Sequence, residues 1–116
     1  MKIGIIRGSF ISSAEMQNFE DLSGRNDVTV FRSWMTKDRF YRPSDSRMTE
    51  VGLFSPYDYV SKNRYIRGIT NRVLVDSHYL FGLEDRLKGF DIAHCAETYY
   101  HYTQQCLNAK KNGFVK

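Results

Sequence analysis

The sequence predicts an α/β fold, in the form of a Rossmann-like three-layer α/β/α domain with a mainly parallel sheet. Short runs of β-branched and aliphatic residues alternate with segments whose apolar residues recur every three or four positions. This alternation is typical of parallel strands connected by helices. The length of 116 residues, with 41% hydrophobic and 26% charged residues, suits a single domain spanning 1–116.

A first strand and helix are expected near the start of the chain. Residues 2–7 form an isoleucine-rich run that ends before Gly8, which fits a central buried strand entering a tight turn. Ser12 or Ser13 can cap the next helix, and Gly24 is placed to end it. The apolar stripe of this helix consists of Met16, Phe19 and Leu22.

The second and third strands are expected at 27–31 and 50–54. Residues 27–31 are a β-branched run that suits parallel pairing beside the first strand. Residues 35–46 are polar, basic and aromatic, and Pro43 bars regular helix there, so we expect an exposed loop. The run 50–54 is a weaker strand that ends before Pro56.

A long helical pattern covers residues 65–87. Asp76 occupies the vacant position in its apolar stripe. Gly68 and Gly82 weaken the pattern, so it predicts one helix or two shorter ones. Gly89 is suited to cap its end. The apolar stripe consists of Ile66, Ile69, Val73, Leu80, Leu83 and Leu87.

A fourth strand and a final helix complete the expected sheet. The strand covers residues 90–95 and the helix covers 99–111. Right-handed crossovers then favour the strand order 3-2-1-4, with helices on both faces. The first and fourth strands would flank the switch point where open α/β sheets bind ligands. One side of the final helix carries Tyr99, Tyr102, Cys106 and Ala109.

Charge, cysteine content and hydropathy narrow the classes of function. The formal net charge of +4 comes from scattered basic residues, which does not demand a nucleic-acid partner. Cys95 and Cys106 are too few for a disulfide framework, and we expect both to be reduced. No metal spacing and no full G-x-G-x-x-G motif is present, so no metal and no cofactor is predicted. Without a signal peptide or a membrane-spanning stretch, we expect a cytoplasmic protein, soluble or peripheral at the membrane.

Three segments resemble the amino-terminal, acceptor-side domain of a family 4 glycosyltransferase of the two-Rossmann-domain kind. They are residues 1–8 (MKIGIIRG), 71–83 (NRVLVDSHYLFGL) and 89–94 (GFDIAH), the last running into 97–100 (ETYY). Their order and spacing span nearly the whole chain. In that family this half holds the acceptor, the other half holds the nucleotide sugar, and transfer occurs in the cleft between them.

The chain departs from the pattern of that family at two points. Many relatives carry a second histidine two positions after the first, where this chain has Ala96, so only His94 and Glu97 match. The 116 residues contain no pair of glutamates on either side of a seven-residue spacer, which is the signature of the donor-side domain, so we expect that domain to be missing from this chain. The resemblance therefore implies no catalytic residue and no transferase activity in the isolated chain.

Four candidate substrate-binding residues are expected at the switch point. Gly8 and Ser9 either close the first turn or let backbone amides approach a phosphate or sugar. His94 is either a strand residue bonded to a backbone carbonyl or a contact for the acceptor. Glu97 complements the dipole of the last helix, accepts hydrogen bonds from acceptor hydroxyls, or does both.

Further candidates lie in the helical segments. Asp76 is either structural or a second-tier ligand contact, because carboxylates are seldom buried without partners. His78 is interpreted as a surface or structural residue. Tyr99 is also second-tier, since the aromatic run 99–102 either packs half-buried or stacks on sugar rings. A basic set either forms a solvated surface or attracts anionic lipid or a phosphate-bearing acceptor: Lys37, Arg39, Arg42, Arg47, Lys62, Arg64 and Arg67.

Three functions remain open. The leading one is the acceptor-binding domain of a retaining glycosyltransferase, with a sugar or glycolipid acceptor. The chain would be either a fragment of such an enzyme or a subunit whose donor domain is another chain. The second is a non-catalytic Rossmann-like binding or protein-interaction module. The third is a basic nucleic-acid-binding protein, although the chain has no helix-turn-helix signature.

We expect the outer edge of the fourth strand, which has no neighbouring strand in the predicted order, to be covered by another segment or by a partner. An unpaired apolar strand is a template for association, and the surface around it should be more apolar than usual. We therefore expect a homodimer, a hetero-complex or the final segment 113–116 to cover the edge formed by Ile92 and Cys95.

Overall fold

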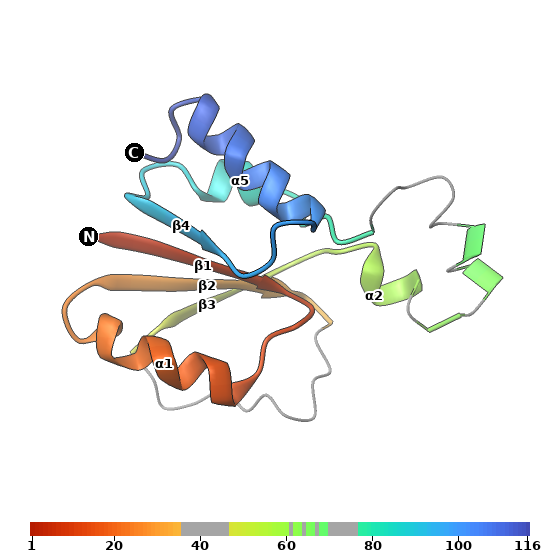
Figure 1. The fold of residues 1–116 in the computed structure, drawn as a ribbon, viewed down its shortest axis with the longest axis horizontal. Coiled ribbons are helices and arrows are strands. Elements are labelled where there is room, and N and C mark those ends of the chain that lie inside the picture. Colours follow the sequence, from red (N-terminus) through yellow and green to blue (C-terminus); the bar gives the residue numbers. More distant parts are fainter. Residues whose placement is uncertain (36–46, 61, 64, 67, 70–76) are drawn as a thin grey trace.

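The centre of the computed structural model is a parallel four-stranded sheet in the order β3-β2-β1-β4 (Figure 1). The structure describes residues 1–35, 47–60, 62–63, 65–66, 68–69 and 77–116. The α/β class and the predicted strand order are confirmed, and the strands differ from prediction only at their ends. They are β1 (Lys2–Gly8), β2 (Asp27–Ser33), β3 (Thr49–Leu53) and β4 (Ile92–Cys95).

β1 lies at the centre because it is apolar on both faces. Ile3 and Ile5 are buried on one face of the sheet, and Ile6 is buried on the other. Ile5 lies opposite Val30 of β2 on one side and opposite His94 of β4 on the other. A strand buried on both faces appears in sequence as a continuous hydrophobic run, which is why β1 is recognisable.

Helix α1 (Ser13–Ser23) covers one face of the sheet. The Ser12 hydroxyl accepts a hydrogen bond from the backbone N–H of Glu15, which confirms the predicted cap. Met16 is buried and Phe19 packs against the core, but Leu22 is 40% exposed, so the apolar stripe ends one turn earlier than predicted. The buried cluster on this face contains Ile3, Ile5, Ile11, Met16, Val28 and Val30.

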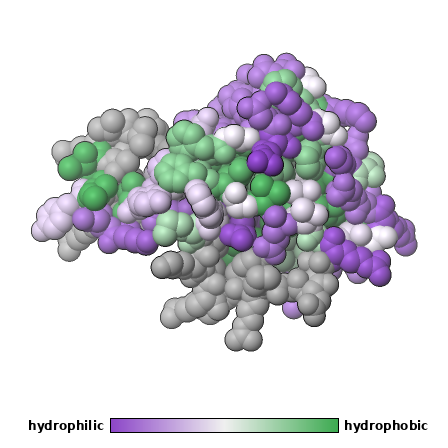
Figure 2. Space-filling model, turned by 180° about the vertical axis from the view of Figure 1, so that it is seen from behind, coloured by the Kyte–Doolittle hydropathy of each residue, from purple (hydrophilic) through white to green (hydrophobic). Residues whose placement is uncertain are grey.

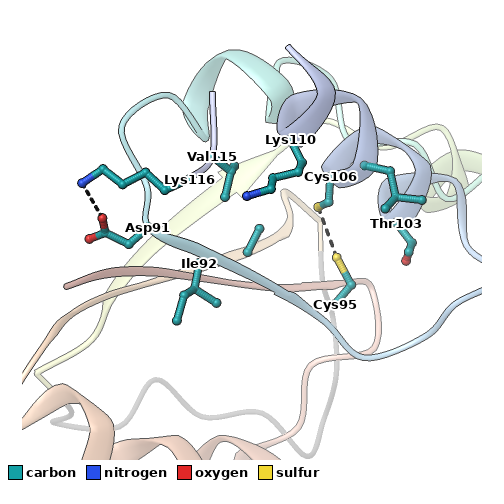
Figure 3. Close-up of a pocket in the computed structure, with 10 residues that line it drawn as sticks. Asp91, Ile92, Cys95, Thr103, Cys106, Lys110, Val115 and Lys116 are labelled. Carbon is teal, nitrogen blue, oxygen red and sulfur yellow. Dashed lines mark hydrogen bonds and ion pairs between the residues drawn. The ribbon is translucent and has the colours of Figure 1, made fainter. Parts of the chain in front are cut away.

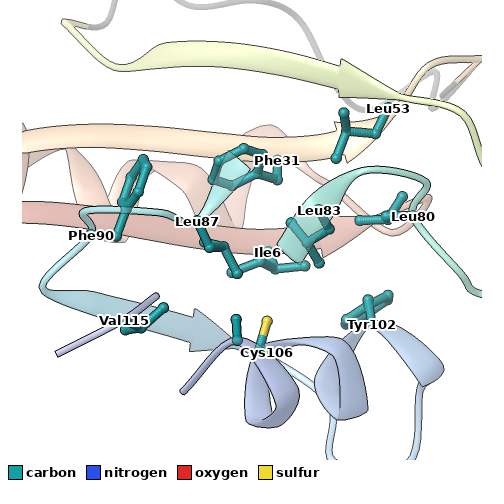
Figure 4. Close-up of a cluster of buried hydrophobic side chains, with 11 residues drawn as sticks. Ile6, Phe31, Leu53, Leu80, Leu83, Leu87, Phe90, Tyr102, Cys106 and Val115 are labelled. Carbon is teal, nitrogen blue, oxygen red and sulfur yellow. The ribbon is translucent and has the colours of Figure 1, made fainter. Parts of the chain in front are cut away.

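Helices α4 (Leu83–Arg86) and α5 (His101–Lys111) cover the other face (Figure 4). Tyr102, Cys106 and Ala109 are buried on one side of α5, as predicted. The prediction that Tyr99 belongs to this side of the helix was wrong, because α5 begins after Tyr99 and the Tyr99 side chain is 70% exposed. The buried cluster contains Ile6, Phe31, Leu53, Leu80, Leu83, Leu87, Phe90, Tyr102, Cys106, Ala109 and Val115.

The segment between β3 and β4 departs most from the sequence prediction. A short helix that was not predicted, α2 (Tyr57–Val60), follows β3. Residues 65–66 and 68–69 are helical, but residues 77–82 are not, so the expected stripe is not one continuous helix. Ile66 and Ile69 are exposed, whereas the later members Leu80, Leu83 and Leu87 are buried. Val73, another expected member, lies outside the described residues.

Tertiary hydrogen bonds explain why residues 77–82 are not helical. The backbone N–H of Phe81 donates to the carbonyl of Phe54 (3.0 Å). The Gln105 side chain bonds both backbone groups of Leu80, accepting from its N–H (3.0 Å) and donating to its carbonyl (2.9 Å). Gly82 then has φ 78°, a left-handed conformation that separates this segment from α4.

The last residues of the chain lie beside the start of β4. Val115 forms a parallel bridge with Phe90, and the backbone N–H of Lys116 donates to the Phe90 carbonyl (3.2 Å). The Lys116 ammonium pairs with the Asp91 carboxylate at 2.7 Å. The final segment thus folds back against Phe90, just before β4, but none of its described backbone bonds reaches Ile92 or Cys95, where cover was expected. No described strand pairs with the outer edge of β4 itself.

The surface mixes hydrophilic and hydrophobic residues. On the face shown in Figure 2, hydrophilic residues cover much of the upper and right-hand parts, and hydrophobic residues gather towards the middle and left. Large exposed side chains include Trp34 and Tyr65. Within the part of the chain that the structure describes, no helix has the length and apolar character of a membrane span.

Candidate functional site

The candidate site lies where the carboxyl ends of β1 and β4 meet. Gly8 ends β1 and is followed by Ser9 and Phe10, while β4 ends at Cys95 and is followed by the loop 96–100. The chain leaves β1 towards α1 on one face of the sheet and leaves β4 towards α5 on the other (Figure 1). Parallel sheets bind ligands where neighbouring connections diverge in this way.

Gly8 allows α5 to pack closely against the end of β1. Its φ is 55°, and a Cβ at this position would lie 2.9 Å from Cε1 of Tyr102. Tyr102 is buried, and this burial raises the pKa of its phenol far above the ordinary value, so the phenol is neutral at physiological pH. Its hydroxyl has no hydrogen-bond partner among the described residues.

Arg7 places a second buried donor at the same end of β1. Its guanidinium pairs with Glu15 of α1 and donates to the carbonyl of Phe10 (3.4 Å). Its Nε is buried, with no hydrogen-bond partner in the described ranges. Burial raises the pKa of the Tyr102 phenol, and the nearby Arg7 charge opposes that rise. Buried donors without partners are unusual in folded proteins.

Ser9 belongs to a polar cluster centred on Asp58 of α2. The Asp58 carboxylate accepts hydrogen bonds from the hydroxyls of Ser9 (3.4 Å) and Ser33 and from the backbone N–H of Met35 (3.3 Å). Asp58 is only 7% exposed and joins the residues that follow β1 and β2 to the helix that follows β3. The Ser9 contact is long for a hydroxyl hydrogen bond, so the Ser9 hydroxyl can exchange its bond to Asp58 for one to a ligand more easily than the other members of the cluster.

An aromatic cluster joins the two loops. Phe10 and Tyr100 stack with ring centroids 5.3 Å apart and planes 10° apart. The His78 ring is half-buried against Tyr57 and Tyr100, at 4.1 and 4.2 Å, in agreement with its interpretation as structural. Tyr99 lies 4.3 Å from Tyr100 with most of its ring exposed. The cluster therefore offers aromatic faces to solvent at the switch point.

Glu97 lies near the same phenols. Its backbone carbonyl accepts a hydrogen bond from the Thr103 hydroxyl. Burial raises the pKa values of Tyr100 and Tyr102, and the nearby Glu97 carboxylate adds to both rises. Glu97 therefore lies with Gly8 at the meeting point of β1 and β4.

His94 is placed differently from the other three switch-point candidates. It is exposed within β4, opposite Ile5, and its ring lies 5.4 Å from that of Phe19. Because Phe19 belongs to α1, the His94 side chain lies on the α1 face of the sheet. Tyr100 and Tyr102 pack with the core on the α5 face.

Two open hollows flank α5. One, of about 300 Å³, is bounded by the loop before α5 and includes Tyr99 and Tyr100. The other, of about 370 Å³, follows the outer edge of β4 and includes Cys95 and Cys106 (Figure 3). Both volumes are at the lower end of the range for small-molecule sites.

Several predicted residues fall outside the described residues. They include Asp76, so its role stays a prediction. Of the basic set, Arg47 and Lys62 are described and exposed. In the described ranges, no group of three His, Cys, Asp or Glu side chains is placed to hold a metal ion. The basic residues outside the described ranges are Lys37, Arg39, Arg42, Arg64 and Arg67.

Comparison of the chain with protein-family models, curated proteins and solved structures gave no match. The resemblance to a glycosyltransferase therefore stays a prediction from the sequence.

Sequence reasoning missed Asp58, Arg7 and Phe10. Asp58 follows Pro56 after a strand parallel to β1, so its arrival at the same end of the sheet could have been inferred. The placement of Phe10 at this end of the sheet could also have been inferred, because Phe10 is the second residue after β1. No pattern in the sequence indicates that Phe10 stacks on Tyr100, because that contact depends on how the two loops meet.

Proposed function

We propose that this chain is a carbohydrate-binding domain that serves as the acceptor side of a retaining glycosyltransferase. One observation carries the proposal. Phe10, from the loop after β1, stacks on Tyr100, from the loop after β4, and Tyr99 beside them exposes most of its ring. Sugar rings present apolar C–H faces that pack on such aromatic surfaces.

The polar groups around this cluster suit sugar hydroxyls. The Glu97 carboxylate can accept hydrogen bonds from hydroxyls, and the Ser9 hydroxyl can donate or accept. Stacking surfaces combined with a few hydrogen-bonding groups are typical of small-ligand sites.

The acceptor would be a free sugar or the sugar of a glycolipid. A glycolipid acceptor would bring this cytoplasmic domain to a membrane surface without inserting it. The sugar donor would bind to a second domain, because a glycosyl transition state must be held from both sides. The isolated domain would accordingly bind the acceptor without catalysing transfer.

The test is binding to an array of short oligosaccharides and glycolipid headgroups, followed by calorimetry on any glycan that is retained. Tyr99→Ala should weaken binding about three- to tenfold, because one aromatic stacking contact contributes about 0.5–1.5 kcal/mol. Tyr65→Ala is the matched control, since Tyr65 is 84% exposed on a different segment. Absence of glycan binding, or equal effects of the two substitutions, would reject the proposal.

A second candidate, a protein-interaction module, is favoured by the edge of β4. The Phe90 carbonyl points outward to the N–H of Lys116. Because backbone groups alternate along a strand, those of Ile92 and His94 point to the same side. A second copy of the chain or a separate donor chain could pair there. Light scattering should then show an assembly, whereas a monomer with unprotected amides at Ile92 and His94 would exclude this candidate.

A further inference from the structure

The two cysteines of the chain are in contact across the sheet and a helix. Cys95 is the last residue of β4 and Cys106 lies in α5, and their Sγ atoms are 3.1 Å apart (Figure 3). Both are free thiols. Since a disulfide has an S–S length of about 2.05 Å, the two sulfur atoms need to approach by only about 1 Å to form one.

The surroundings of the two thiols differ. Both cysteines line the open hollow of about 370 Å³ beside β4, but Cys95 is half-buried whereas Cys106 is only 7% exposed and packs within the core. The contact with the Cys106 thiol lowers the pKa of Cys95, and the neighbouring Thr103 side chain lowers it further, against the effect of burial. The same contact raises the pKa of Cys106, together with burial. Cys95 is therefore the thiol that ionises and reacts first.

The chain between the two cysteines carries part of the candidate site. Residues 96–105 include Glu97, Tyr99 and Tyr100 and connect β4 to the first turn of α5. A bond between the cysteines would close this loop and fix both of its ends. The chemistry of the pair stands apart from the carbohydrate-binding proposal, although both involve the same loop.

We propose that Cys95 and Cys106 form a reversible dithiol–disulfide site that reacts with low-molecular-weight disulfides such as oxidised glutathione. Cys95 is the attacking residue and Cys106 is the resolving residue. The hollow beside β4 gives the reagent access to Cys95.

The reaction proceeds in two exchange steps. In the first, the Cys95 thiolate attacks one sulfur of oxidised glutathione, so that a Cys95–glutathione bond forms, the reagent's S–S bond breaks and one glutathione leaves and takes up a proton. In the second, Cys106 loses its proton and attacks Sγ of Cys95, which forms the internal disulfide and releases the second glutathione. The protein loses two protons and two electrons, equivalent to two hydrogen atoms, and oxidised glutathione gains them to become two molecules of glutathione.

The experiment is an equilibrium titration of the full-length chain in glutathione redox buffers, followed by intact-mass spectrometry after acid quenching. The native chain should lose the mass of two hydrogen atoms, and dithiothreitol should restore it. The equilibrium constant for the internal disulfide should exceed that of the same chain in guanidinium by about tenfold or more, equivalent to about 30 mV or more, because folding holds the thiols together.

Two single variants assign the roles of the cysteines. Cys106→Ser should accumulate a stable glutathione adduct on Cys95, whereas Cys95→Ser should react at least about tenfold more slowly, because the remaining thiol is buried. A lasting adduct on Cys95 in the unmodified chain, a disulfide between two chains, or an equilibrium constant no higher than in guanidinium would each overturn the proposal. If either variant is unfolded, the comparison of native and denatured wild-type chain still decides it.

Discussion

The β1–α1 and β4–α5 units share one order of elements, but the links between strand and helix differ. In the first unit, Ser12 caps α1 with its side chain and Arg7 pairs with Glu15. In the second, α5 has no side-chain cap, and the backbone N–H of Tyr102 donates instead to the carbonyl of His78 (3.1 Å). β1 has a paired strand on each side, whereas β4 is paired within the described sheet only to β1.

The difference indicates that the link between β4 and α5 has more groups free to contact a ligand than the link between β1 and α1. The polar groups of the first link mostly bond one another. The second link leaves a large part of Tyr99 exposed and places two free thiols at its ends. Ligand-binding groups are commonly carried by loops that a rigid scaffold positions, and here β1 and the capped helix α1 are the scaffold.

The largest effect on stability is expected from a substitution that disturbs the contact between the two units, where Gly8 packs against Tyr102. Gly8→Ala would force alanine into a left-handed conformation and bring its Cβ against Tyr102. We expect the free energy of unfolding to fall by about 3 kcal/mol, from backbone strain and overpacking together. Urea denaturation measures this loss.

Gly82→Ala is the matched control for that substitution. Gly82 also has a positive φ, 78°, but a Cβ there would meet no atom within 4 Å. Only the backbone strain remains, so we expect a loss of about 1 kcal/mol. Equal losses at Gly8 and Gly82 would show that the contact with Tyr102 does not matter.

Gln105→Leu tests the interior polar contact that fixes the second unit. The substitution removes both hydrogen bonds to Leu80 and leaves its N–H and carbonyl buried without partners. We expect a loss of about 2 kcal/mol in the free energy of unfolding. Gln104→Leu, on the exposed side of the same helix, should change it far less. A neutral Gln105→Leu would contradict the account of residues 77–82.

Ser12→Ala tests the cap of the first unit. The hydroxyl that accepts from the Glu15 N–H would be lost, and we expect the free energy of unfolding to fall by about 1 kcal/mol. Guanidinium titration followed by circular dichroism measures the change. An unchanged midpoint would show that the ion pair between Arg7 and Glu15 suffices to hold the start of α1.

The smallest expected effect concerns Asp91, which links the start of β4 to β1. Hydrogen bonds from the Lys116 ammonium (2.7 Å) and the Lys2 backbone N–H (2.8 Å) lower the pKa of this carboxyl below its ordinary value. A carboxyl with a lowered pKa in the folded state stabilises the fold above its unfolded pKa, and this contribution disappears as pH falls through the folded pKa. Carbon-13 NMR should show this titration, and Lys116→Gln should move the midpoint upward.

The scaffold could be predicted from the sequence because local patterns determine it. The isoleucine run of β1, the β-branched run of β2 and the cap at Ser12 each indicate one element without reference to distant residues. The strand order then follows from the handedness of parallel crossovers.

The second half of the chain was harder to predict because distant contacts override its local pattern. Residues 77–82 continue a helical repeat, but Gln105 and Phe54 bind their backbone groups in a non-helical path. Of the candidate site, the positions of Gly8, Ser9 and Glu97 follow from the strand order. The aromatic cluster and the contact between the thiols depend on how β4 and α5 pack, which no spacing in the sequence specifies.

The most direct test of the account is an amide chemical-shift map of the reduced protein titrated with octyl glucoside below its micelle concentration. We expect the chemical-shift changes to concentrate at residues 8–10 and 97–102, with the amides of α1 unchanged. Tyr99→Ala should reduce these changes, whereas Tyr65→Ala should not. Shifts centred on α1, or shifts that Tyr99→Ala leaves intact, would contradict the claim that the loops after β1 and β4 form the binding site.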